Sequence, residues 1–269
     1  MKPFLKWPGG KHRVVHRIRQ RLPQGRRLVE PFVGSGAVFL NTAYPTAWLA
    51  DINADLIALY QAVQTTGPDF IEAARPFFTP ENNRPDRYYE HRARFNACAD
   101  PWERSTLFLY LNRHGYNGLV RYNSAGHFNV PFGRYTRPYF PETELAAFAA
   151  ASQRAAFQCA DFRAVMEAAE PGDVIYCDPP YIPLSATANF TDYAGGGFGP
   201  QDQQDLAALA RRLATRDIPV LISNHDTAWS VELYSGAQLD RFPVPRFISC
   251  DGDHRDPARE LLALFGGAE

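Results

Sequence analysis

The sequence predicts an α/β fold: a Rossmann-like, doubly wound and largely parallel sheet, interrupted once by an insertion. Short apolar runs typical of buried strands alternate with amphipathic helical patterns over residues 26–64. The alternation stops near Gly67, and the chain to Pro141 is rich in proline and aromatic residues. It resumes afterwards and continues to the end of the sequence. Strands alternating with helices indicate βαβ units, so we expect one sheet domain with a second domain inserted into it.

The patterns before the insertion predict four elements in order. Residues 26–36, "RRLVEPFVGSG", indicate a strand that ends in a tight glycine turn, and 37–44, "AVFLNTAY", indicate a helix. Residues 46–51, "TAWLAD", predict a second strand. A helix follows over 53–64, "NADLIALYQAVQ", where Asn53 is the expected N-cap.

The insertion has a different character. Residues 104–114, "RSTLFLYLNRH", have a helical period, whereas 115–135, "GYNGLVRYNSAGHFNVPFGRY", resemble loops or a hairpin. We therefore expect a mainly helical domain containing a hairpin over residues 61–141. Residues 1–60 and 142–269 then form the sheet domain.

The remaining elements follow the same alternation of strands and helices. We expect strands over 155–162, 173–178 and 218–224, helices over 163–170 and 201–216, and a final strand or short helix over 258–265.

Charge is distributed unevenly along the chain. The net charge is −1, yet Arg104 to Pro141 contains five arginines and no acidic residue. A second basic cluster covers residues 11–27, where a solvated face is an equally good interpretation. In the central segment the arginines alternate with tyrosines and phenylalanines. Guanidinium groups beside flat rings suit a surface that holds phosphates and meets bases, which favours a nucleic-acid partner.

Composition excludes several classes of protein. The four cysteines are far apart and form no CxxC pair, which argues against a zinc site and a disulfide framework. The first residues lack the apolar stretch of a signal peptide, and no run is long enough to span a membrane. We expect a cytoplasmic protein without a bound metal or a membrane.

Ligands of such sheets bind beyond the carboxyl ends of the strands. Gly34 and Gly36 form a tight turn there, and Asp51 ends the next expected strand, where a carboxylate can accept hydrogen bonds from ribose hydroxyls. This pair suits a nicotinamide dinucleotide or S-adenosylmethionine, or is a plain strand-to-helix turn. Phe39 replaces the third glycine of a GxGxxG motif, which disfavours the dinucleotide.

The stretch "YCDPPY" is the most informative one. Pro179 and Pro180 have no N–H, so strand pairing must stop at Asp178. The Asp178 carboxylate and a carbonyl near Pro179 offer two acceptors for the two N–H groups of an exocyclic amine, and Tyr181 can stack on its base. A methyl on a sulfonium is the matching electrophile, since the reaction needs mainly in-line positioning. In duplex DNA the base must first be flipped out.

The chain resembles the Dam family of DNA adenine methyltransferases, which methylate adenine N6 within GATC using S-adenosylmethionine. The matching segments cover nearly the whole chain: "FLKWPGGK" (4–11), "LVEPFVGSGAVFLN" (28–41), "LADINADLIALY" (49–60), "LFLYLNRHGYNGLVRYN" (107–123), "FNVPFGRY" (128–135), "YCDPPYIPLSATANFT" (176–191) and "IPVLISNHDT" (218–227).

The resemblance implies roles for individual residues. It implies S-adenosylmethionine contacts by Trp7, Lys11, Asp51 and Asp178, with the loop from Phe32 through Gly34 to Gly36 beneath the cofactor and Asp161 and Phe162 near its adenine. It implies that Asp178, Pro179 and Tyr181 are catalytic and hold the target base. For double-stranded DNA it implies guanine contacts by Arg121 and Lys6, thymine-methyl contacts by Leu119 and Pro131, entry into the base stack by Tyr116 and Asn117, and phosphate contacts by Arg113 and Arg134.

Several alternatives remain open. The same chemistry serves cytosine N4, another adenine site or an amide in protein, and an inactive DNA-binding protein could keep the scaffold. A catalytic role for His225 is not expected, because a methylated amine can shed its proton after transfer. The acidic segment 249–260 departs from the family's usual basic one and would weaken a phosphate contact there. We expect a monomer without an obligate protein partner, associated with the nucleoid of a bacterium or with phage DNA.

Overall fold

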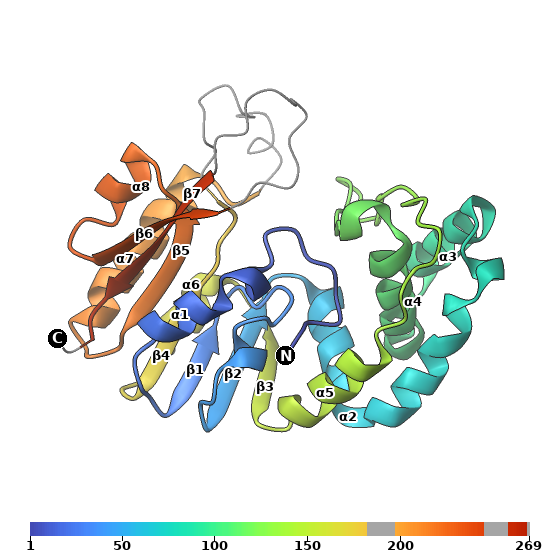
Figure 1. Ribbon diagram of the computed structural model, residues 1–269, viewed down its shortest axis with the longest axis horizontal. Helices are drawn as coiled ribbons and strands as arrows, with labels where there is room; N and C mark the ends of the chain where they lie inside the picture. The colour runs from blue at the N-terminus through green and yellow to red at the C-terminus, as the bar shows by residue number, and fades with distance from the viewer. Residues whose placement is uncertain (182–196, 245–257, 268–269) are drawn as a thin grey trace. The chain divides into compact units, whose positions relative to one another are not determined.

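The computed structural model describes residues 1–181, 197–244 and 258–267. Its seven strands form one mixed sheet in the order β3-β2-β1-β4-β5-β7-β6 (Figure 1). The strands are β1 (Arg27–Glu30), β2 (Thr46–Asp51), β3 (Ala155–Cys159), β4 (Asp173–Cys177), β5 (Val220–His225), β6 (Gln238–Val244) and β7 (Ala258–Phe265). The predicted α/β class is therefore confirmed.

The chain divides into two compact units. Unit 1 contains residues 1–19 and 33–160, and unit 2 contains residues 20–32 and 161–269. The expected recognition domain over 61–141 lies within unit 1, and its boundaries stay a prediction.

In unit 1, β2 and β3 run parallel, with Ala47 opposite Ala155 and Asp51 opposite Cys159. Helix α2 packs on both α4 and α5, and α3 packs on α4, as the cyan-to-green ribbons of Figure 1 show. Their bounds are α2 (Ala54–Ala74), α3 (Pro85–Ala97), α4 (Pro101–His114) and α5 (Glu142–Ser152). Short 3-10 turns η1 to η5 cover Lys11–Arg13, Phe39–Asn41, Arg75–Phe78, Pro80–Asn82 and Tyr116–Gly118.

Three local predictions differ from the structure of unit 1. The helix expected over 37–44 is only the 3-10 turn η2 at Phe39–Asn41. The helix that begins after Asn53 extends through Pro68 to Ala74, with non-helical angles at Thr66. Residues 115–135 form no hairpin ladder; they are held by isolated bridges between Gly115 and Phe132 and between Tyr122 and Phe128.

In unit 2, β1, β4 and β5 run parallel, so their carboxyl ends lie at one edge of the sheet. The strands β7 and β6 are antiparallel additions, which makes β7 a strand rather than the short helix that was also expected. Helix α7 packs on α6, β5 and β7. The remaining helices of the described residues are α6 (Phe162–Glu167), α7 (Pro200–Ala214) and α8 (Ala228–Leu233) of unit 2, and α1 (Val15–Arg21), most of which belongs to unit 1.

The burial of β4 and β5 agrees with their central places in the sheet. All five residues of β4 are buried, as are the first five of β5, which is typical of central parallel strands. Among the described helices, none is long and apolar enough to cross a bilayer.

Candidate active site

The chain turns sharply after β1. Gly34 and Gly36 have φ of +46° and +69°, in the left-handed region that favours glycine. A Cβ on Gly34 would lie 2.9 Å from Nε1 of Trp7, so only glycine allows the indole to approach the backbone here. The Gly34 carbonyl accepts a hydrogen bond from the Tyr60 hydroxyl. The predicted residues Trp7, Gly34 and Gly36 thus belong to one closely packed turn.

Asp51 stands at the carboxyl end of β2, beside this turn. Its Oδ2 accepts the N–H of Gly34 at 3.1 Å, and its Oδ1 accepts the N–H of Asn53 at 3.0 Å. Burial raises the pKa of the Asp51 carboxyl, and hydrogen bonds from the backbone N–H groups of Asn53, Gly34 and Ile52 oppose that shift. The predicted N-cap is confirmed, because Asn53 Oδ1 accepts the N–H of Leu56. These bonds fix the direction of the Asp51 carboxylate.

Lys11 lies in η1 and is buried, with Nζ donating to the Gly9 carbonyl at 2.7 Å. A buried lysine in a glycine-rich segment is not a plain solvated side chain, which was the alternative interpretation.

In unit 2 the predicted adenine neighbours form an aromatic cluster. Phe32 stacks on Phe162 with ring centroids 5.3 Å apart, and Phe198 meets Phe32 edge-on at 5.5 Å. Asp161 caps α6 by accepting the N–H of Arg163 at 2.8 Å. The structure therefore brings Phe32, Asp161 and Phe162 together.

The Arg163 guanidinium holds this corner in place. It donates to Asp202 and Asp205, each at 2.6 Å, and lies 4.4 Å above the Phe162 ring. No local sequence pattern predicts this network, because Asp202 and Asp205 of α7 lie 39 and 42 residues away from Arg163.

The segment after β4 leaves the sheet as its two prolines predict. Asp178 is half-buried and Pro179 is buried, directly after the fully buried Cys177. The Pro180 carbonyl accepts a hydrogen bond from Nε2 of the buried Gln203 at 2.8 Å. Rigid prolines and this bond fix the direction of the main chain around Asp178.

Tyr181 packs against the end of the neighbouring parallel strand. Its ring meets the His225 ring edge-on at 4.7 Å, and its hydroxyl donates to Glu260 at 3.3 Å. Residues 182–196, which complete the predicted motif, and most of the acidic segment 249–260 lie outside the described residues.

The residues predicted to contact DNA differ in their solvent exposure. Tyr116, Asn117, Arg121, Pro131 and Arg134 are exposed, and Leu119 is half-buried. Asn117 and Arg134 adopt φ of +53° and +51°, a conformation that is uncommon among residues other than glycine. The exposed residues all belong to the loops that follow α4.

Lys6 is half-buried and packs against these loops. Its Nζ donates to the Arg113 carbonyl at 3.0 Å and lies 3.5 Å from the centre of the Tyr135 ring. Burial and the Arg113 cation lower the pKa of Lys6 to about 8. The buried Asn112 side chain holds the Lys6 peptide, accepting its N–H at 2.9 Å and donating to its carbonyl at 2.7 Å.

Arg113 differs from the expectation of a phosphate contact. It is 8% exposed, and its guanidinium donates to the carbonyls of Tyr139 at 3.1 Å and Phe4 at 3.4 Å. Burial lowers the pKa of this guanidinium. Its donors serve the protein interior, so we assign Arg113 a structural role. The physical reason is that Ser105–His114 of α4 are buried on every side.

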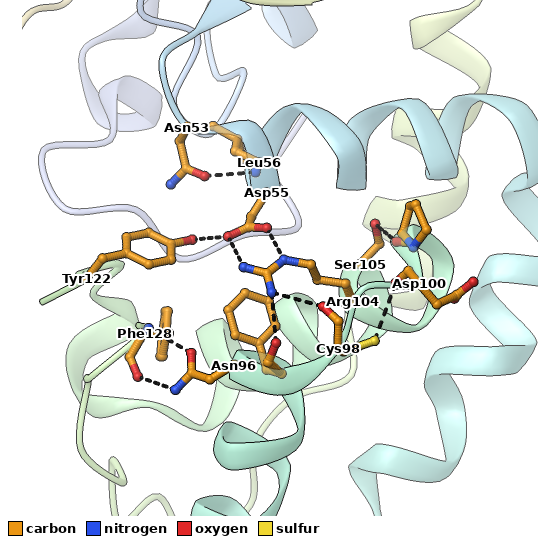
Figure 2. A network of polar contacts seen from close by, with 12 residues as sticks. Asn53, Asp55, Leu56, Asn96, Cys98, Asp100, Arg104, Ser105, Tyr122 and Phe128 are labelled. Atoms are coloured by element: carbon orange, nitrogen blue, oxygen red, sulfur yellow. Dashed lines mark hydrogen bonds and ion pairs between the residues drawn. The ribbon is translucent and has the colours of Figure 1, made fainter. Parts of the chain in front are cut away.

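Arg104 is paired with a carboxylate of unit 1, as Figure 2 shows. It donates to both carboxylate oxygens of Asp55, at 2.5 and 3.0 Å, and Asp55 also accepts the Tyr122 hydroxyl at 2.5 Å. The five arginines of the basic segment are therefore not one surface. Asp55 and Tyr122 were not among the predicted site residues, since nothing in the sequence joins positions so far apart.

Comparison with known proteins assigns the sequence to a family. Residues 7–242 match the D12 class of N6 adenine-specific DNA methyltransferases. The chain is similar to three proteins named DNA adenine methylase, from Salmonella typhi (53% identical), Escherichia coli K12 (52%) and Vibrio cholerae (53%). Each alignment covers 98% of this chain and 95%, 95% and 96% of the relative, respectively. The chain therefore belongs to the D12 class of N6 adenine-specific DNA methyltransferases, with DNA as its substrate and S-adenosylmethionine as its cofactor.

Proposed function

We propose that this enzyme methylates adenine N6 within GATC in double-stranded DNA, with Asp178, Pro179 and Tyr181 as the residues that hold the adenine. The observation that carries the proposal is the fixed main chain after β4, where the buried Pro179 and the bonded Pro180 carbonyl restrict how Asp178 can point. The GATC assignment is supported by similarity to relatives named DNA adenine methylase.

The residues of unit 1 fit the cofactor. The Gly34 turn leaves no room for a Cβ beneath the Trp7 ring, and the Asp51 carboxylate at the end of β2 suits the hydroxyls of a ribose. We assign Trp7, Lys11, Gly34, Gly36 and Asp51 to S-adenosylmethionine binding in this unit.

Unit 2 contains an aromatic cluster and a carboxylate that also suit S-adenosylmethionine. The stacked Phe32 and Phe162 rings provide an apolar face, and Asp161 begins the helix after it. We assign Phe32, Asp161, Phe162 and Asp178 to cofactor binding, and the bound cofactor supplies a methyl group on a positively charged sulfur.

The chain's own task is to make adenine N6 a nucleophile. The lone pair of that amine is delocalised into the ring, which makes it a poor nucleophile. The Asp178 carboxylate and the Pro179 carbonyl accept its two N–H groups and favour a pyramidal nitrogen with a localised lone pair. The Tyr181 ring stacks on the base. The adenine must leave the helix first, and unstacking a base costs a few kcal/mol.

Residues 61–141 form the DNA target-recognition domain in this proposal. Arg121 and Lys6 contact guanine, Leu119 and Pro131 contact thymine methyl groups, Tyr116 and Asn117 enter the base stack, and Arg134 contacts a phosphate. The protein acts as a monomer, without an obligate protein partner, on DNA of the nucleoid or of a phage.

Nucleoside mass spectrometry tests the proposal. Two duplexes, one with GATC and one with that site scrambled, are incubated with the protein and S-adenosylmethionine. We expect N6-methyladenine from the first duplex only, and none from either with Asp178→Ala, whose DNA binding should persist. Methylcytosine, or methyladenine from both duplexes, would overturn the assigned base or site. DNA binding without any product would indicate an inactive binding protein.

A further inference from the structure

Arg121 stands on a small closed loop, the reading loop, defined here as residues 121–129. The N–H of Asn129 donates to the Arg121 carbonyl at 3.0 Å, and the N–H of Asn123 donates to the His127 carbonyl at 2.9 Å. The Arg121 guanidinium itself donates to Asn129 Oδ1 at 2.7 Å. The orientation of this loop therefore decides where the exposed Arg121 side chain points.

Asn96 of α3 fixes one side of the reading loop. Its Oδ1 accepts the N–H of Phe128 at 2.8 Å, and its Nδ2 donates to the Phe128 carbonyl at 3.1 Å. Phe128 is 1% exposed, so this peptide group is attached to the interior of unit 1 (Figure 2).

Tyr122 fixes the other side, next to Arg121. Its ring meets Phe128 edge-on at 5.8 Å, and its hydroxyl reaches across to Asp55 of α2. Without that hydroxyl, the Arg121 end of the reading loop would keep its hydrogen bonds to Asn129. It would lose its hydrogen bond to Asp55 of α2.

Asp55 is a fixed and charged acceptor. The Arg104 guanidinium donates to both of its oxygens, and that guanidinium is itself held by the Phe95 carbonyl at 2.8 Å and lies 4.1 Å above the Phe95 ring. Asp55 also lies in the first turn of α2, where the helix dipole stabilises a negative charge. Burial and the bond to Asp55 raise the pKa of Tyr122, so its phenol stays a donor at neutral pH.

We propose that Tyr122 is a positioning residue for guanine recognition: its hydrogen bond to Asp55 holds the reading loop in the orientation that presents Arg121 to a guanine. The inference rests on the proposed function. A guanidinium forked onto guanine O6 and N7 tolerates little displacement, so a small rotation of the loop removes the contact without removing Arg121. Tyr122 contacts no base in this mechanism.

The test compares Tyr122→Phe with Tyr110→Phe, each of which deletes a single hydroxyl. Tyr110 is a matched control, because it is a buried tyrosine of unit 1 that donates to the Asn82 carbonyl at 2.7 Å, outside the reading loop. Substitution of Asp55 is less informative, since it would leave Arg104 without its ion pair and threaten folding. The kcat/KM is measured on GATC duplexes and on duplexes carrying 7-deazaguanine, which lacks N7, in one strand at a time.

Wild type should discriminate against 7-deazaguanine in one of the two strands. Tyr122→Phe should lower kcat/KM on GATC by roughly tenfold, the size of a lost hydrogen bond to a charged group, and should lower the discrimination by a similar factor. Binding of S-adenosylmethionine without DNA should not change. Tyr110→Phe should keep the wild-type discrimination, even if it lowers the melting temperature as much as Tyr122→Phe does.

Two results would overturn the inference: discrimination by Tyr122→Phe within about twofold of wild type, or an equal loss in Tyr110→Phe. Failure of the proposed function would be visible separately, because wild type itself would then methylate neither duplex or methylate both equally.

Discussion

Gly118 gives a sharp test of how Lys6 packs against the loops after α4. Its φ is +66°, and a Cβ there would lie 2.2 Å from the Lys6 Cβ and 3.0 Å from its Cδ. Lys6 cannot move aside freely, since Asn112 holds both polar groups of its peptide. Gly118→Ala should therefore be strained twice, by its backbone angle and by this contact.

The expected loss of stability is the sum of two costs, one from the backbone angle and one from the crowded contact. A side chain in the left-handed region costs roughly 1–2 kcal/mol. Relief of an overpacked contact costs roughly 1–3 kcal/mol more, so the free energy of unfolding should fall by about 2–5 kcal/mol. Gly126→Ala is a matched control: φ is +75° there, and a Cβ would have no neighbour within 4 Å. It should lose only the backbone term.

Chemical and thermal unfolding of both variants measure the difference. Each kcal/mol corresponds to a shift of roughly 2–4 °C in melting temperature for a chain of this size. Gly118→Ala should also weaken binding of a GATC duplex, because the added methyl group displaces Lys6, which we propose contacts a guanine. Equal destabilisation of the two variants would refute the reasoning, since it would mean that Lys6 does not crowd Gly118.

Three further predictions follow from the described contacts. Arg134→Met should reduce the slope of log affinity for DNA against log salt by about 1, whereas the buried Arg113→Met should leave that slope unchanged and lower the melting temperature; titrations at several salt concentrations check both. Burial and the Arg113 cation lower the pKa of Lys6 to about 8, so its positive charge is present below that pH and lost above it. DNA affinity should therefore fall between pH 7 and pH 9 in wild type but not in Lys6→Met, as fluorescence anisotropy can measure. Asp173→Asn should destabilise the protein by about 1–3 kcal/mol in urea, because the buried Asp173 accepts the Arg27 guanidinium at 2.8 and 2.6 Å and Arg27 is partly exposed.

Much of the sheet was predictable because each signal was local. A run of apolar residues ending at two prolines predicted β4 and its stop, since proline removes the donor that a ladder needs. Asn53 before a helical period predicted the start of α2, since an N-cap satisfies a nearby N–H. The helix expected at 37–44 is only a 3-10 turn at Phe39–Asn41. Residues 37–40 are all buried, so the packing of this segment overrides its helical pattern.

The partners of charged side chains were not predictable in the same way. Arg104 and Asp55 are separated by 49 residues, and no local pattern joins them. The burial of Arg113 had a weak signal: "TLFLYL" is apolar on every side, which is typical of a helix packed all round. A cation in the last turn of such a helix must find its partners inside, and Arg113 finds them at backbone carbonyls.

The pairing of Arg104 and the burial of Arg113 reduce the positive charge that the basic segment can offer to DNA. Composition gives residues 104–141 five positive charges for DNA, yet Arg104 neutralises Asp55 and Arg113 is buried, which leaves Arg121, Arg134 and Arg137 exposed. Each phosphate neutralised on duplex DNA contributes about −0.9 to the salt slope, so five arginines would give roughly −4.5. Because we assign Arg121 to guanine, Arg134 and Arg137 remain for phosphates and account for roughly −1.8. Arg104 and Arg113 therefore organise the loops after α4, and we propose that the exposed arginines meet the DNA.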